Sequence, residues 1–352
     1  MTTLLDPIQL GALWLPNRIV MAPLTRLRST GDDERTPNEL MRAYYVQRAS
    51  AGLILTEATS VAPMGVGYWR SPGIWSDAHT VAWRSVTDAV HEAGGRIMLQ
   101  LWHVGRISHP VFLGGQIPVG PSAIAPKGDV SLIRPKQAFV VPRALALIEL
   151  QGVVEAYRTG AANAKRAGFD GVELHGANGY LLDQFLQDGS NQRTDRYGGS
   201  IENRARLMLE VTDAVIGVWG ADRVGMHLAP RSDSHSMGDS DRAATFGHVV
   251  DELAERKLAF IASREAEGPD SLGPKLKRRF GGTWIANEKF TLESANAAIQ
   301  RGDADAVAFG KAFIANPDLV ERFRAGAALD APQPETFYAG EENGYTTYPR
   351  LA

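Results

Sequence analysis

The chain has 352 residues, of which 44% are hydrophobic and 22% charged, and this balance excludes an intrinsically disordered protein. It contains no cysteine, which excludes disulfides, thiolate zinc sites, iron–sulfur clusters and a cysteine nucleophile. Its formal net charge of −3 excludes a bulk positive field that would attract nucleic acid or anionic lipid.

The N-terminal segment, MTTLLDPIQLG, lacks the basic start and the apolar core of a signal peptide. No stretch approaches the roughly 20 unbroken apolar residues that a membrane helix needs. We therefore expect a soluble protein without nucleic-acid or membrane partners, cytoplasmic by default. Residues Ile8–Leu15, with a turn near Gly11, are interpreted as a short N-terminal hairpin that closes the bottom of the fold.

Short apolar runs alternate with segments of helical periodicity along the chain, and this alternation indicates repeated βαβ units. The apolar runs are nearly continuous, as expected for strands that are covered on both faces. Eight strands are predicted, at Arg18–Ala22, Leu53–Ala58, Arg96–Leu101, Gly171–His175, Val224–Ala229, Leu258–Ser263, Thr283–Asn287 and Ala306–Gly310.

The segments between these strands have helical periodicity. Helices are predicted at Pro37–Ala51, Asp77–Ala93, Ile148–Ala167, Ile201–Val218, Ala243–Glu255, Pro274–Phe280, Leu292–Arg301 and Pro317–Ala325. Pro37 is interpreted as the first residue of its helix, a position that tolerates proline. Gly94 and Gly168 follow helices, where a C-cap glycine belongs. The basic residues within Pro274–Phe280 are interpreted as a solvated helix face.

Strands that alternate with helices in this number predict an α/β fold of the (β/α)₈ TIM-barrel type, with residues 1–352 forming a single domain. An open doubly wound sheet is the alternative, but it would want a G-x-G-x-x-G turn, which is absent. About forty residues separate the third strand from the next helix, and a connection this long predicts a lid over the active site.

A histidine and an asparagine lie three residues apart in the motif HGANGY, directly after the fourth strand. His175 and Asn178 can both donate hydrogen bonds to one acceptor, which is what a polarised carbonyl or nitro oxygen needs. Tyr180 can supply a proton near the same point. The alternative is a capped turn with a histidine satisfied in the core.

Loops after the seventh and eighth strands form the usual phosphate site of this fold. Here Asn287, Glu288 and Lys289 follow strand seven, whereas Gly310 and Lys311 follow strand eight. Glycine lets backbone N–H groups approach an anion, and lysine supplies positive charge. An ordinary turn between strand and helix is the alternative interpretation.

Several motifs resemble those of the Old Yellow Enzyme family of FMN-dependent ene-reductases. They lie in order along essentially the whole chain: PLTR from Pro23, TEAT from Thr56, QLWH from Gln100, VELHGANGYLLDQF from Val172, DRYGGSIENR from Asp195, AFGKAFIANPDL from Ala308 and GYTTYP from Gly344. The resemblance implies a non-covalent FMN across the barrel mouth and NADPH as the hydride donor, with NADH as the alternative.

The resemblance also implies roles for individual residues. Thr25 resembles the threonine that bonds the flavin C4 carbonyl, within a cofactor-binding set of Pro23, Leu24, Thr25, Ala58, Gln100, His227, Asn287, Glu288, Lys289, Gly310 and Lys311. His175 and Asn178 resemble the pair that binds the substrate oxygen, and Tyr180 resembles the proton donor. The implied walls of the substrate pocket are Tyr68, Trp102 and Tyr338. No metal is implied.

The implied reaction is reduction of the activated C=C bond of unsaturated aldehydes, ketones, nitroalkenes or imides. The chain departs from the family at His227 and Lys311, where the family has arginine. A weakly active or non-catalytic flavin-binding paralogue is therefore one alternative, and a phosphate-binding barrel lyase without flavin is another. The physiological substrate and the choice between monomer and homodimer are left open by the sequence.

Overall fold

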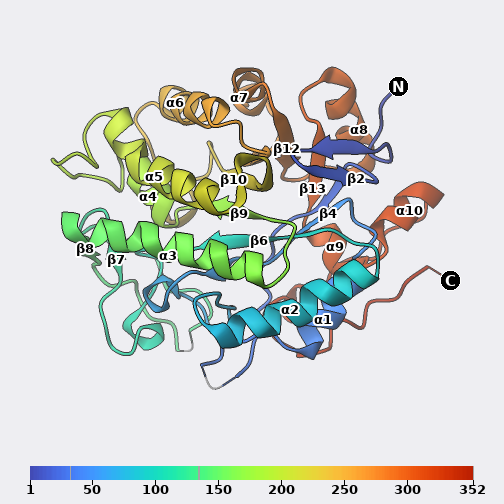
Figure 1. Ribbon diagram of the computed structural model, residues 1–352, viewed down its shortest axis with the longest axis horizontal. Helices are drawn as coiled ribbons and strands as arrows, with labels where there is room; N and C mark the ends of the chain where they lie inside the picture. The colour runs from blue at the N-terminus through green and yellow to red at the C-terminus, as the bar shows by residue number, and fades with distance from the viewer. Residues whose placement is uncertain (32, 134, 352) are drawn as a thin grey trace.

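The computed structural model of the chain describes residues 1–31, 33–133 and 135–351. Its centre is a ring of parallel strands, each hydrogen-bonded to the next, with the last strand paired to the first (Figure 1). The ring consists of β3 (Ile19–Met21), β4 (Leu53–Leu55), β6 (Ile97–Trp102), β9 (Gly171–His175), β10 (Val224–Leu228), β11 (Phe260–Arg264), β12 (Thr283–Asn287) and β13 (Ala306–Phe309). Closure confirms the TIM barrel and excludes the open sheet.

Helices surround this ring, as Figure 1 shows. They are α1 (Glu39–Val46), α2 (Asp77–Glu92), α3 (Leu147–Arg166), α5 (Ile201–Trp219), α6 (Arg242–Glu255), α7 (Gly273–Phe280), α8 (Leu292–Arg301) and α10 (Leu319–Ala325). Each lies where a helix was predicted, with ends shifted by a few residues. Two short helices, α4 (Leu181–Leu186) and α9 (Lys311–Ala315), were not predicted. Single 3₁₀ turns occur at Pro63–Gly65, Pro110–Phe112, Ala221–Arg223, Ser234–Ser236 and Pro334–Thr336.

The ends of the helices depend on local capping. Asn38 caps α1, because its side-chain oxygen accepts a hydrogen bond from the backbone N–H of Met41 at 3.0 Å. Pro37 therefore precedes the cap, and its prediction as the first helical residue is wrong. Gly94 and Gly168 follow α2 and α3 with φ of 81° and 83°, which confirms both as C-cap glycines.

The N-terminal hairpin closes the barrel as predicted. Its strands β1 (Ile8–Leu10) and β2 (Leu13–Leu15) pair antiparallel. The backbone N–H of Ala12 donates to the carbonyl of Asp222, which directly precedes β10 at the amino end of the ring. A Cβ on Gly11 would lie 2.1 Å from that same carbonyl oxygen, so only glycine permits this approach.

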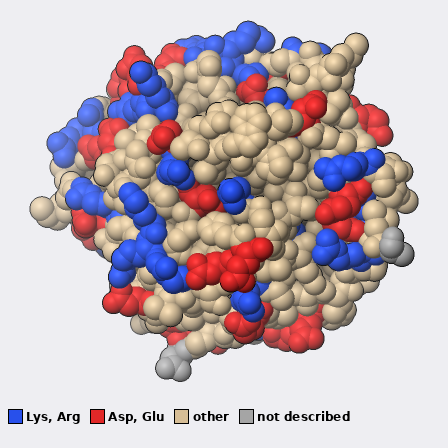
Figure 2. Space-filling view, turned by 45° about the vertical axis from the view of Figure 1, so that its right-hand side comes forward, with Lys and Arg blue, Asp and Glu red and all other residues tan. Residues whose placement is uncertain are grey.

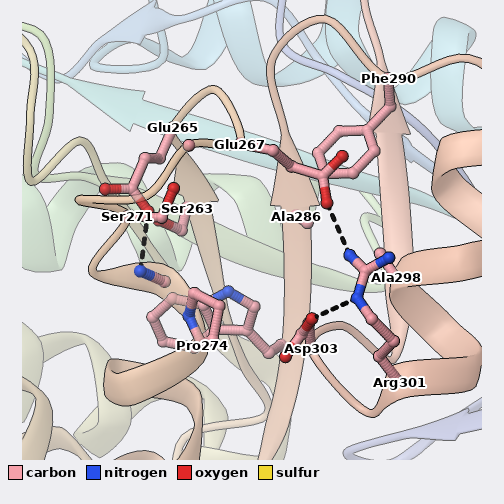
Figure 3. Close-up of a pocket in the computed structure, with 13 residues that line it drawn as sticks. Ser263, Glu265, Glu267, Ser271, Pro274, Ala286, Phe290, Ala298, Arg301 and Asp303 are labelled. Atoms are coloured by element: carbon pink, nitrogen blue, oxygen red, sulfur yellow. Dashed lines mark hydrogen bonds and ion pairs between the residues drawn. The ribbon is translucent and has the colours of Figure 1, made fainter.

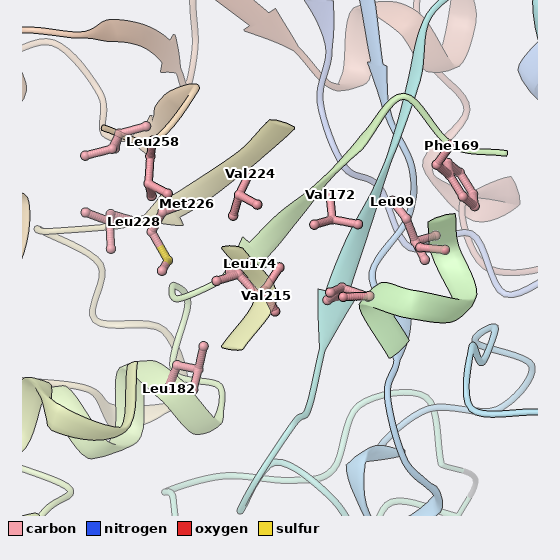
Figure 4. Packing of buried hydrophobic residues seen from close by; sticks show 14 of the residues in the cluster. Leu99, Phe169, Val172, Leu174, Leu182, Val215, Val224, Met226, Leu228 and Leu258 are labelled. Carbon is pink, nitrogen blue, oxygen red and sulfur yellow. The ribbon is translucent and has the colours of Figure 1, made fainter. Parts of the chain in front are cut away.

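Alternation along the strands separates two surfaces of the sheet. Val172 and Leu174 of β9, like Met226 of β10, point outward and pack beneath the helices (Figure 4). Inward residues near the closed end are apolar and contact the hairpin; examples are Phe260 and Ile285. The barrel interior near the closed end and the layer beneath the helices are therefore both apolar.

The long connection after β6 contains two short strands, β7 (Val119–Gly120) and β8 (Arg143–Ala144), which pair with each other. A further short strand, β5 (Thr59–Ser60), pairs with β6 outside the ring. Ser131 and Leu132 of the connection line the cavity at the carboxyl end of the barrel. The connection thus forms part of the cavity wall, and its movement as a lid stays a prediction.

Charges of both signs are interspersed over the face shown in Figure 2. The basic residues of α7 are partly paired, since Lys277 contacts Asp305 and Arg279 contacts Asp251. This pairing fits the interpretation of that cluster as a solvated helix face. Within the described part of the chain, no helix is long and apolar enough to cross a membrane.

Candidate active site

A cavity of about 750 Å³ lies at the carboxyl ends of the barrel strands. It is lined by residues that are far apart in the sequence, because parallel strands bring their carboxyl ends to one mouth. The predicted site residues in its wall are Pro23, Leu24, Thr25, Tyr68, Asn178, Tyr180, His227, Asn287, Glu288, Lys289, Gly310, Lys311 and Tyr338.

Four predicted site residues, Ala58, Gln100, Trp102 and His175, are buried directly behind this wall. The Trp102 ring lies 4.8 Å from the ring of Tyr180. The His175 ring stacks on that of His227 at 5.3 Å. Gln100 is bonded to His227, whereas Ala58 packs in one apolar cluster with Trp102. The structure thus brings all the predicted site residues to one end of the barrel.

The turn after β9 holds the candidate donors in place. Asn178 and Gly179 adopt left-handed backbone with φ of 59° and 81°. The buried carboxylate of Asp183 accepts the N–H of Gly179 at 2.8 Å, which closes the turn onto α4. His175 Nδ1 is buried without a hydrogen-bond partner among the described residues, so a histidine satisfied in the core does not fit.

Burial determines the charge state of this histidine. It lowers the pKa of His175 well below its usual range, and the neighbouring His227 and Arg264 lower it further. The ring is therefore neutral near pH 7 and has one N–H to donate. His175 is thus a neutral ring that can donate one hydrogen bond, and it is not a cation.

Tyr180 begins the short helix α4 and faces the cavity. Its hydroxyl lies 3.0 Å from that of Tyr68. Burial, together with Tyr68, raises the pKa of Tyr180 well above its usual range, and burial raises the pKa of Tyr68 to about 12. Both phenols therefore carry their protons near neutral pH.

Three adjacent strands place polar side chains inside the barrel below the cavity. Gln100 Nε2 donates to Glu173 at 2.7 Å and to His227 Nδ1 at 3.1 Å. Burial raises the pKa of Glu173 to about 8 and lowers the pKa of His227 to about 3. Because Nδ1 accepts, the neutral His227 carries its hydrogen on Nε2, which has no partner among the described residues.

The loops after β12 and β13 form the other end of the cavity. Glu288 and Lys289 have φ of 106° and 61°, in a region that favours glycine. Such strain persists where the surroundings determine the conformation, and it is concentrated at functional sites. Gly310 and Lys311 follow β13 at the start of α9. Lys289 and Lys311 are both exposed, so this end is positive and suits a phosphate.

These features together fit FMN. The buried Nε2–H of His227 offers a hydrogen bond to a ring with polar edges, and the neighbouring His175 Nδ1 also lacks a partner among the described residues. Leu24 and Phe309 add apolar wall, and the lysines lie where a phosphate belongs. The donor set thus matches a planar heteroaromatic ring joined to a phosphate.

The C-terminal segment supplies Tyr338 to the cavity. Arg26 donates to the backbone carbonyls of Phe337 and Gly344 at 3.0 and 2.8 Å. The Tyr345 ring stacks on Tyr44 at 4.1 Å. These contacts fix a segment near the chain end against the loop after β3 and against helix α1.

The residues of the cavity wall that sequence reasoning missed include Arg264 and His235. Arg264 is the last residue of β11, one position beyond the predicted end of that strand. His235, in a turn with left-handed backbone, donates a hydrogen bond from Nδ1 to the backbone carbonyl of Asn178 at 2.7 Å. A strand prediction extended by one residue would have placed Arg264 at the mouth, whereas no sequence pattern indicates His235.

A smaller cavity of about 190 Å³ lies outside the barrel, between β12 and helices α7 and α8 (Figure 3). Arg301 at its rim pairs with Glu267 and Asp303. Phe290 lines both cavities. Since no predicted site residue faces the smaller cavity, it is not the candidate active site.

Known proteins resemble the chain over almost its full length. Residues 3–330 match the NADH:flavin oxidoreductase / NADH oxidase family model. A probable flavin mononucleotide-dependent alkene reductase from Leishmania infantum is 44% identical, over 98% of this chain and 97% of that protein. Morphinone reductase, solved in complex with tetrahydroNAD, superposes with a TM-score of 0.96 at 48% identity, over 100% of this chain and 98% of that chain.

An old yellow enzyme homologue from Zymomonas mobilis also has a TM-score of 0.96, at 42% identity over 99% of this chain and 100% of that chain. These matches confirm the resemblance drawn from the sequence motifs, and they exclude the alternative of a flavin-free lyase. The chain therefore belongs to the FMN-dependent NADH:flavin oxidoreductase / NADH oxidase family, among the homologues of Old Yellow Enzyme.

Proposed function

We propose that this protein is an ene-reductase that takes hydride from NADPH, or alternatively NADH, and reduces activated C=C bonds. The proposed substrates are α,β-unsaturated aldehydes, ketones, nitroalkenes or imides. One observation carries the proposal: Asn178 and the protonated Tyr180 line one cavity, and the ring of the neutral His175 lies directly behind its wall, 4.9 Å from the Tyr180 ring.

The residues that would hold FMN lie on both sides of the cavity. Thr25 and the three polar residues beneath the mouth, Gln100, Glu173 and His227, would form hydrogen bonds with the edge of the ring. Lys289 and Lys311 would hold the phosphate. When bound, FMN accepts a hydride from reduced nicotinamide and delivers one to the β-carbon of the substrate. The protein supplies binding, orientation and electrostatics.

His175 and Asn178 are the proposed binding pair for the substrate oxygen. Two donors on one oxygen stabilise the negative charge that develops there when the β-carbon gains hydride. Because His175 is neutral, it needs no counterion. The substrate oxygen can therefore accept its hydrogen bond without first displacing an anion. The same pair suits the amide oxygen of nicotinamide.

Tyr180 is the proposed proton donor to the α-carbon. Its hydroxyl is protonated, the half-buried residue lines the cavity, and the hydrogen bond to Tyr68 orients the hydroxyl. A general acid of this kind must reach the carbon that becomes basic as hydride arrives at its neighbour. The Tyr180 ring lies 4.9 Å from the His175 ring, and this short distance supports a proton donor beside the proposed oxygen site.

The hydride donor is proposed to bind in the same cavity as the substrate. The chain has no G-x-G-x-x-G turn of its own, so the dinucleotide would bind in the same cavity as the substrate. Morphinone reductase was solved in complex with tetrahydroNAD, which supports a nicotinamide dinucleotide at this position. We place NADPH first and NADH second.

An anaerobic visible spectrum of the FMN-supplemented protein tests the proposal. We expect a bound-flavin spectrum that bleaches when NADPH is added and recovers when an unsaturated ketone follows. Absence of bound flavin, or bleaching without recovery across all four substrate classes, would exclude the ene-reductase. The second outcome would leave a flavin-binding protein without this activity.

A further inference from the structure

Arg264 projects from the end of β11 into the cavity and connects two other loops. Its Nε donates to a carboxylate oxygen of Glu288, in the loop after β12, at 2.5 Å. Its Nη1 donates to the side-chain oxygen of Asn178, in the turn after β9, at 3.0 Å. One guanidinium thus joins the cofactor end of the cavity to the candidate oxygen-binding turn.

The contact with Asn178 determines what its amide offers to a ligand. A carboxamide presents an acceptor on one branch and two donors on the other, and rotation by half a turn exchanges them. Arginine can only donate, so its bond requires the Asn178 oxygen to face it. The amide NH₂ group is then the branch left to interact with a ligand.

The rest of the turn is held at a second point. The Asn178 backbone carbonyl lies 2.7 Å from His235 Nδ1, and the backbone itself is in the left-handed region. These restraints fix the main chain of Asn178 but leave its side-chain torsion free. Among the described residues, Arg264 is the only hydrogen-bond partner recorded for the Asn178 side chain.

Glu288 in turn restrains the guanidinium of Arg264. Its side chain is 25% exposed and comes from a backbone at φ 106°, a conformation that L residues rarely adopt. Such a conformation persists when surrounding contacts determine it, and the pair with Arg264 is one such contact. Glu288, Arg264 and Asn178 therefore form a chain of contacts across the mouth.

We propose that Arg264 is a positioning residue that fixes the Asn178 amide as a hydrogen-bond donor toward the ligand oxygen, and that Glu288 fixes Arg264. The site then selects ligands that present an acceptor oxygen, such as carbonyl, nitro or carboxamide groups. This inference rests on the proposed function, because it assigns Asn178 the same ligand oxygen.

A double-mutant cycle tests the inference on the FMN-loaded protein. The variants are Arg264→Met, Asn178→Ala and the two combined, with tetrahydroNAD titrated as a non-reacting ligand and its Kd read from the flavin spectrum. We expect each single variant to weaken binding about tenfold. We expect the combined variant to bind within about twofold of Asn178→Ala, because coupled residues are not additive.

Two further variants distinguish the positioning of Asn178 from two other effects, a change in the charge of the cavity and a loss of folding stability. Glu288→Gln keeps the donation from Arg264 to Asn178 and should weaken binding by less than about threefold. Arg301→Met removes an arginine of another exposed ion-pair cluster, outside the cavity, and should leave Kd and FMN content unchanged. The melting temperature and FMN content of each variant are recorded.

An unchanged Kd in Arg264→Met, or an equal further loss when it is added to Asn178→Ala, would overturn the positioning role. If the wild type still reduces an enone, either of these outcomes would contradict only the positioning role of Arg264 and would leave the proposed function intact. A wild type that neither bleaches with NADPH nor reduces an enone would instead contradict the proposed function.

Discussion

The two ends of the barrel use the same strands in opposite ways. At the amino end, Leu10 and Leu15 of the hairpin are fully buried against apolar inward residues. At the carboxyl end, several inward residues are polar, and buried nitrogens of His175 and His227 lack partners among the described residues. Left-handed backbone at Asn178 also lies at this second end. One end therefore serves stability, and the other is kept available for a ligand.

Strand β11 shows over how few residues the inward side chains change from apolar to charged. Its inward positions, in order, are Phe260, Ala262 and Arg264. Phe260 fills the space over Gly225, where a Cβ would lie 2.1 Å from the ring. Four residues later, the guanidinium of Arg264 faces the cavity. Since side chains alternate along a strand, four residues suffice to pass from the closed end to the site.

The largest expected effect is at the open end. Tyr180→Phe should slow alkene reduction by about 10² to 10⁴, the usual contribution of a general acid, while flavin reduction by NADPH continues. Stopped-flow measurement of the two half-reactions separates them. Tyr68→Phe is the matched control, since it removes the same hydroxyl–hydroxyl bond but leaves the Tyr180 phenol. An equal loss of alkene-reduction rate in both variants would show that the Tyr68–Tyr180 hydrogen bond matters, and not the proton that Tyr180 would donate.

The closed end should respond in stability and not in chemistry. Leu15→Ala removes a fully buried side chain and should reduce the free energy of unfolding by about 2–5 kcal/mol. Urea unfolding measures this, and FMN affinity of the folded protein should not change. Trp14→Ala, in the same strand but 63% exposed, should cost less than about 0.5 kcal/mol. A loss of FMN affinity in Leu15→Ala would show that the two ends are coupled.

A charge placed at the open end should strengthen cofactor binding. His227→Arg puts a permanent cation beside Glu173, whose Oε1 has no partner among the described residues, and beneath the proposed flavin ring. We expect FMN to bind about tenfold more tightly, as measured by fluorescence titration. His227→Gln, which offers a donor without charge, should bind like the wild type. Unchanged affinity in His227→Arg would contradict the proposed effect of this family departure.

The polar interior at the open end also introduces a pH dependence of stability. Burial raises the pKa of Glu173 from 4.5 to about 8, so the folded state keeps a proton that the unfolded state has released. Stability therefore falls as pH rises from 4.5 to about 8. Glu173→Gln should make the unfolding free energy less dependent on pH across this window. Parallel curves for the two proteins would contradict this assignment.

Much of this architecture was determined by the sequence itself. The barrel strands and the eight predicted helices follow from local periodicity, which depends on neighbours a few residues away. The motifs around Thr25, His175 and Lys311 were readable because barrel strands deliver their carboxyl ends to one mouth. Pro37 was misplaced because the side chain of Asn38, a residue equally suited to turns, decided the helix start.

Tertiary structure alone decided how these residues are coupled. Arg264 meets Asn178 across 86 positions of sequence and meets Glu288 across 24, and no local pattern indicates either contact. Tyr338 reaches the cavity because Arg26 bonds backbone carbonyls of its segment. Periodicity indicates which face of a strand is buried, but a hydrogen bond between distant side chains depends on how the barrel closes around both.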